Sequence, residues 1–91
     1  MIFFGFGKAE EMPEFGKRFR ECRKAAGLTQ VEAAEKMDIG RSSISEYETD
    51  ASEPTASVLY KMSVAYGVSV NYLLGLPDED QSDNEPANGE D

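Results

Sequence analysis

The chain has 91 residues, with nine basic and eighteen acidic side chains and a formal net charge of −9. That length suffices for one small domain. It contains no histidine and a single cysteine, Cys22, which excludes an intrachain disulfide, disfavours structural zinc and suits a reducing, cytoplasmic compartment. Apolar runs stay well short of the ~20 residues of a membrane span. Without a nucleophile–base pair or a metal-ligand set, we expect no enzyme, no cofactor, no small-molecule substrate and no membrane partner.

The negative charge is concentrated at one end of the chain. Residues 77–91 carry seven acids and no base, whereas residues 1–76 carry eleven acids and nine bases. Five of those bases lie between residues 14 and 26. We therefore expect a near-neutral body with one basic helix and a disordered acidic tail over 77–91. The tail has two interpretations: a solubilising segment, or a competitor of DNA for the basic helix.

Residues 1–13 are predicted to form an N-terminal arm, because two glycines and Pro13 interrupt any regular pattern. Its aromatic cluster, Phe3, Phe4 and Phe6, has three interpretations. It is an arm that pairs two subunits, a patch folded onto the body, or a consequence of a natural start at Met12.

The first helix is predicted over residues 14–26. Phe15, Phe19, Cys22 and Ala26 recur at helical spacing and form one apolar stripe, and Gly27 ends the helix. Cys22 on this stripe indicates a small buried core residue rather than a redox switch.

The second and third helices form a pair with a tight turn between them. Thr29 and Glu32 have the spacing of a capping box at the start of the second helix. Asp38 is expected to adopt a positive φ in the turn, and Gly40 to cap the third helix. The third helix is predicted from Arg41 to about residue 49. Ile44 and either Tyr47 or Glu48 should face inward, and the outward positions are Arg41, Ser42, Ser45 and Glu46.

Two further helices are predicted towards the C-terminus. Thr55 opens the fourth helix, whose inner positions are Ala56, Leu59, Met62 and Tyr66, and Gly67 ends it. Ser69 caps a short fifth helix. The predicted fold is therefore an all-α, compact five-helix domain over residues 14–76.

The run from Phe15 to Gly75 resembles the Cro-repressor-type (XRE-type) helix-turn-helix family. The resemblance rests on GLTQ at 27–30, the alanine pair at 33–34, SxxISxYE at 42–48, Pro54 and the ending GVSVNYLLG. It implies a lambda-repressor-like fold that binds double-stranded DNA as a homodimer, with the third helix in the major groove. The implied function is a sequence-specific transcriptional regulator, and we expect a repressor that occupies a near-palindromic operator.

The resemblance also implies a set of contact residues. Gln30 would contact phosphate, and Arg23 would pair with Glu48 while being presented towards the DNA backbone. Arg41 would make a bidentate contact to guanine, and Glu46 would accept from cytosine. The full set of candidate DNA-binding residues is Arg23, Gln30, Arg41, Ser42, Ser43, Ser45 and Glu46.

One departure from the family supports an alternative function. After the third helix the family often carries a basic loop, but here Asp50 and Glu53 occupy it, which should lower the affinity for phosphate. The alternative is a helix-turn-helix scaffold used as a protein-interaction module, antitoxin- or antirepressor-like, with weak DNA binding. Apolar side chains on the last two helices suit either a larger core, a homodimer contact or a partner surface: Val58, Tyr60, Val64, Val70, Leu74 and Leu76.

Overall fold

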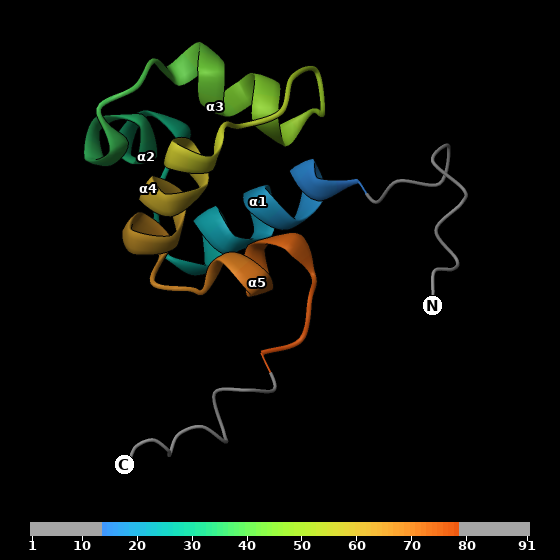
Figure 1. Cartoon of the computed structure of the whole chain (residues 1–91). Coiled ribbons are helices and arrows are strands. Elements are labelled where there is room, and N and C mark those ends of the chain that lie inside the picture. The colour runs from blue at the N-terminus through green and yellow to red at the C-terminus, as the bar shows by residue number, and fades with distance from the viewer. Residues whose placement is uncertain (1–13, 79–91) are drawn as a thin grey trace.

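The computed structural model describes residues 14–78, so the predicted arm over 1–13 and all but the first two residues of the predicted tail lie outside the described residues. The described part is all-α, as predicted. Its five helices are α1 (Phe15–Ala25), α2 (Gln30–Met37), α3 (Arg41–Glu48), α4 (Ala56–Tyr66) and α5 (Val70–Leu74). In Figure 1, α3 lies at one end of the domain and α5 at the other, with α1 and α4 between them.

Side-chain caps fix the starts of three helices. The Thr29 hydroxyl accepts from the Glu32 amide at 3.0 Å, and the Glu32 carboxylate accepts from the Thr29 amide at 2.9 Å. This reciprocal capping box satisfies two amides that have no partner within α2. Thr55 and Ser69 cap α4 and α5 in the simpler way, each accepting from the amide three residues on.

The turn between α2 and α3 has the predicted backbone. Asp38 is left-handed, with φ of 57° and ψ of 47°, and Gly40 is the N-cap of α3. A short polar side chain tolerates the left-handed region better than a branched one does. The turn therefore holds α2 and α3 at a fixed angle.

The core gathers one or two large side chains from each helix. Phe19, Ile44, Met62 and Leu73 are almost completely buried, and Ala33 and Ala34 let α2 pack closely on its neighbours. Two predicted inner positions, Ala26 and Ala56, are exposed instead. Both lie at helix ends, where the apolar stripe has already turned away from the core.

The N-terminus of α1 packs directly on the C-terminus of α3. A Cβ placed on Gly16 would lie 2.5 Å from the carbonyl oxygen of Glu48, so only glycine fits there. The Gly16 amide donates to Asp50 Oδ1 at 3.0 Å, while Glu14 at the N-cap provides no side-chain cap. Asp50, left-handed at φ 63°, thus caps a helix that begins 35 residues before it.

The chain after α5 folds back on that helix. Asn71 Nδ2 donates to the Pro77 carbonyl at 3.0 Å, and the Ser69 hydroxyl donates to Asp78 Oδ2 at 2.7 Å. Pro77 and Asp78 therefore lie beside α5, at the end of the domain away from α3 (Figure 1). Within residues 14–78, no helix is long and apolar enough to cross a bilayer.

Candidate nucleic-acid interface

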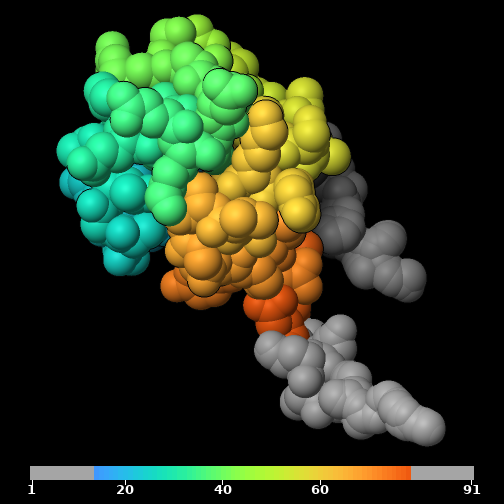
Figure 2. Space-filling view, turned by 90° about the vertical axis from the view of Figure 1, so that its left-hand side faces the viewer, coloured from blue at the N-terminus to red at the C-terminus, as the bar shows by residue number. Residues whose placement is uncertain are grey.

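The α2–α3 unit forms one end of the domain surface. Figure 2 shows its atoms, coloured from teal to green, gathered above α4. Ile44 anchors α3 in the core, and the opposite side of α3 faces solvent. A helix that is held on one side and free on the other can enter a groove of about 12 Å width, such as the DNA major groove.

The candidate reading residues differ in how far they reach solvent. Arg41, Ser42 and Glu46 are exposed, whereas Ser43 and Ser45 are half-buried. The Ser52 hydroxyl contacts Glu46 Oε1 at 3.4 Å, which ties that carboxylate loosely to the loop after α3. Arg41, at the first position of α3, is therefore the exposed cation of this helix.

A chain of hydrogen bonds links the starts of α2 and α3 to the end of α3. Arg41 Nη1 donates to Gln30 Oε1 at 2.9 Å, and Gln30 Nε2 donates to Glu48 Oε1 at 3.1 Å. These two contacts settle which way the Gln30 amide is turned. Gln30 keeps one amide proton free, and Arg41 keeps its Nε and Nη2 donors free, for further partners.

Arg23 lies behind this chain of contacts and is only 7% exposed. Its Nε and Nη2 donate to the two oxygens of Glu48 at 2.6 and 3.1 Å, and its Nη1 donates to the Leu28 carbonyl at 2.8 Å. The hydrogen bond to Glu48 raises the pKa of Arg23, and burial opposes that rise. The ion pair implied by the resemblance is present. Arg23 is thus linked to Gln30 through Glu48.

Two parts of this arrangement were not foreseen from the sequence. The Arg41–Gln30 contact joins residues eleven apart, and no local pattern marks it. The sequence marks Asp50 only as an acid that weakens phosphate binding, whereas in the structure its carboxylate caps α1. Among residues 14–78, no group of His, Cys, Asp and Glu side chains could hold a metal ion.

The helix-turn-helix family model matches residues 19–73, and the chain belongs to this family. The match covers the four helices from α2 to α5 except the last residue of α5, and most of α1.

Curated relatives are transcription regulators. The chain is 50% identical over 70 residues to the HTH-type transcriptional regulator ImmR of Bacillus subtilis (strain 168), which covers 77% of this chain and 54% of ImmR. It is 37% identical over 60 residues to the immunity repressor protein of Bacillus phage phi105, covering 66% of this chain and 42% of the repressor. The chain thus spans about half the length of the curated relatives it matches.

A solved structure shares the fold across its whole length. The restriction-modification controller protein C.AhdI from Aeromonas hydrophila superposes with a TM-score of 0.65 at 26% identity. The superposition covers 70% of this chain and 97% of that protein. The likeness therefore extends over nearly the whole of that solved chain.

Proposed function

We propose that the chain is a sequence-specific DNA-binding transcriptional regulator, a repressor that occupies a near-palindromic operator as a homodimer. The observation that carries the proposal is the Arg41–Gln30–Glu48–Arg23 chain of contacts. It holds two donors side by side at the starts of α2 and α3, the half-buried Gln30 and the exposed Arg41. Relatives named as HTH-type regulators and as an immunity repressor support the same function.

Gln30 is the proposed phosphate contact. It is the first residue of α2, beside the amides at the start of that helix, which attract anions. Its remaining amide proton can be donated to a phosphate oxygen while Glu48 holds the other. Arg23, which holds Glu48 in turn, is proposed to position Gln30 and so to act on DNA indirectly.

Arg41 is the proposed reader of a guanine. Its free Nε–Nη2 edge matches the O6 and N7 acceptors of guanine, a contact that contributes about 1–3 kcal/mol of discrimination. Glu46 accepts from cytosine N4 and repels phosphate, so it acts mainly against wrong sequences. Ser42, Ser43 and Ser45 are the remaining contacts, through hydroxyls or bridging water.

Homodimer formation is proposed from the apolar side chains on the last two helices. Tyr60 and Val64 on α4 are 68% and 66% exposed, and Leu76 after α5 is 54% exposed. An interface built on them would be two-fold, since repressors of this geometry read half-sites about 10 bp apart.

The test is a selection of bound fragments from the source genome at about 50 mM and 200 mM salt, a range in which phosphate contacts lose affinity. We expect recovery of a short near-palindrome whose enrichment falls at the higher salt. A folded sample that enriches no sequence at either salt contradicts the proposal and favours the protein-interaction module.

The variant Arg41→Ala tests whether Arg41 reads a base. The free-energy difference between the preferred and the other base pairs at one operator position should fall by about 1–3 kcal/mol. Lys36→Ala, an exposed cation near the end of α2, is the matched control and should leave the sequence preference unchanged.

A further inference from the structure

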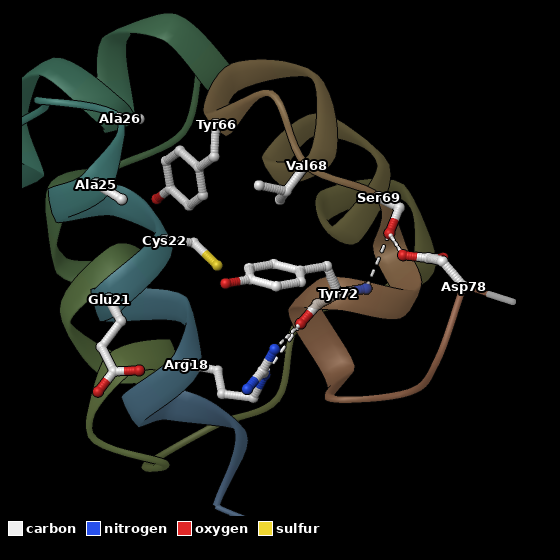
Figure 3. Close-up of a pocket in the computed structure, with 10 residues that line it drawn as sticks. All are labelled: Arg18, Glu21, Cys22, Ala25, Ala26, Tyr66, Val68, Ser69, Tyr72 and Asp78. Carbon is white, nitrogen blue, oxygen red and sulfur yellow. Dashed lines mark hydrogen bonds between the residues drawn. The ribbon is translucent and has the colours of Figure 1, made fainter. Parts of the chain in front are cut away.

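A groove of about 740 Å³ runs between α1 and α5, on the other side of α1 from α3. Its α1 side is formed by small or polar residues, and its far side by two tyrosine rings. Figure 3 shows its lining, which includes Arg18, Cys22, Ala25, Tyr66, Val68 and Tyr72. The volume lies within the range of roughly 300–1,000 Å³ that ligand-sized pockets have.

The groove exposes an aromatic ring to which an apolar side chain could bind. Tyr72 is 52% exposed although the next residue of α5, Leu73, is completely buried. Arg18 covers one face of the Tyr72 ring at 4.8 Å and donates to the Tyr72 carbonyl at 2.6 and 2.9 Å. The guanidinium is thereby fixed at one end of the groove, and the alanines at the other end leave the space between the helices unfilled.

One buried polar atom behind the wall of the groove has no partner among the described residues. Tyr66 is only 6% exposed, and its hydroxyl makes no hydrogen bond with any described residue. In Figure 3 its oxygen points towards α1, near Ala25 and Cys22. Burial, followed by the charge of Glu48, raises the pKa of Tyr66 to about 12, so the hydroxyl keeps its proton and can donate. Buried hydroxyls without a partner are rare in folded proteins. Less than 1 Å² of this oxygen is accessible, so it lies behind the wall of the groove, and an occupant would contact the accessible part of the Tyr66 side chain.

We propose that the groove between α1 and α5 is the docking site of the chain's own N-terminal segment, residues 1–9, through Phe3, Phe4 and Phe6. Those residues lie outside the described part of the chain. This proposal corresponds to one of the three interpretations of the aromatic cluster, the patch folded onto the body.

The reach of the segment fits the groove. Phe6 lies nine positions before Phe15, and an extended chain over nine steps spans up to about 30 Å at roughly 3.3 Å per residue. The groove begins at Arg18, within the first turn of α1. It extends to Ala26, about 12 Å further along the helix at 1.5 Å per residue. A segment that turns back near Pro13 therefore reaches every part of it.

The charges are complementary as well. Glu21 and Asp78 line the groove against the single cation Arg18, so its lining carries a net negative charge. Residues 1–9 contain Lys8 and no acid. Insertion of the three phenyl rings thus removes apolar surface from water while Lys8 faces carboxylates.

Cys22 provides the probe, because the chain has no other cysteine and this thiol lines the groove. Burial raises the pKa of this thiol, so only a small fraction of it is ionised at neutral pH. Labelling of the full chain with a thiol reagent is therefore run at about pH 8.5, near the ordinary thiol pKa. We expect the triple variant Phe3→Ser, Phe4→Ser, Phe6→Ser to label about tenfold faster than the native chain. That ratio corresponds to a segment docked about nine-tenths of the time.

Two controls separate docking from other effects. The triple variant with leucine at the same three positions keeps the apolar contact and should label nearly as slowly as the native chain. Urea unfolding of all three proteins shows whether a faster rate comes merely from a less stable fold, since opening of the whole domain would also expose the thiol.

A second measurement, made on the native chain, identifies the occupant of the groove directly. We expect nuclear Overhauser contacts between the Phe3, Phe4 or Phe6 rings and Tyr72, unchanged in strength on tenfold dilution. Equal labelling rates for native and serine proteins, or an absence of these contacts, overturn the proposal. Protection that weakens on dilution also overturns it, because a second copy would then fill the groove.

Discussion

Glu48 connects the core of the domain to its proposed DNA-binding surface. It accepts from Arg23 twice and from Gln30 once, and its side chain is only 3% exposed. A buried carboxylate is tolerated only with such partners, because desolvation would otherwise favour its neutral form. One side chain therefore contributes both to the stability of the fold and to the orientation of Gln30.

Replacing Glu48 by Met should lower the free energy of unfolding by about 3–5 kcal/mol, because Arg23 is left charged and buried without its partner. Urea unfolding followed by circular dichroism measures the loss. The double variant Arg23→Met, Glu48→Met removes both charges and should recover most of the stability. A double variant as unstable as the single one would show that shape, rather than charge, decides this site.

Tyr66 predicts a dependence of stability on alkaline pH. Its pKa is raised to about 12 in the folded protein from an ordinary value of 10.0, mainly by burial. A raised folded pKa contributes stability that is fully present below pH 10 and is lost as the pH rises from about 10 to 12. Tyr66→Phe has no hydroxyl to ionise, so its stability should fall less steeply across that window. Parallel urea titrations of both proteins between about pH 9 and 12 test this; equal slopes would contradict it.

At the scale of elements, α1 depends on contacts from the far end of α3. Its first turn contains no acidic side chain, and Glu14 provides no cap. Asp50 and the α3 carbonyls at Tyr47 and Glu48 close that end instead. The angle between α1 and α3 is therefore set by backbone-to-backbone packing at Gly16, which in turn holds Arg23 opposite Glu48.

Gly16→Ala should destabilise the domain although alanine favours a helix interior by about 1 kcal/mol over glycine. The new methyl group would meet the Glu48 carbonyl at 2.5 Å, and relieving such a clash typically costs about 1–3 kcal/mol. Thermal or urea unfolding measures the net change. Lys17→Ala, at the exposed neighbouring position, is the control and should be close to neutral. An unchanged stability for Gly16→Ala would mean that α1 can shift without loss.

In the whole molecule, the C-terminal end of the described chain and the proposed DNA-binding surface lie at opposite ends. Asp78 is held beside α5 by Ser69, whereas α2 and α3 form the other end. Residues 79–91 follow Asp78 and carry six more acids without a base. Their field acts on any approaching polyanion over a Debye length of about 10 Å at 0.1 M salt.

Removal of residues 79–91 should tighten nonspecific DNA binding at low salt, because the net charge changes from −9 to −3. The cut falls after Asp78 so that its contact with Ser69 remains. Fluorescence anisotropy with a random duplex at about 50 and 200 mM salt measures the effect, which should shrink at the higher salt. A control chain that keeps the length but replaces the six acids by Ser or Asn should behave like the truncated one. Unchanged DNA affinity at low salt would contradict the competition of the tail with DNA and favour its interpretation as a solubilising segment.

Much of the fold was predictable because its signals are local. Thr29 and Glu32 lie one helical turn apart, Asp38 ends α2 through its own backbone preference, and the spacing of Phe15, Phe19 and Cys22 alone marks the buried side of α1. The exposed positions of Arg41, Ser42 and Glu46 followed from the same periodicity. The prediction that Ala26 and Ala56 face inward was wrong. Both lie at helix ends, where no further helical turn packs on the core.

The five helices, the side-chain caps of α2, α4 and α5 and the family follow from the amino-acid sequence, since each depends on residues within a few positions of one another or on a shared motif. Three contacts between distant groups became visible only in the folded domain: Asp50 with Gly16, Arg41 with Gln30, and Arg18 with Tyr72, which are 34, 11 and 54 residues apart. Propensity and capping act over one or two turns of chain. Contacts over longer separations depend on how the helices pack, and packing is set by the shapes of all the core side chains together.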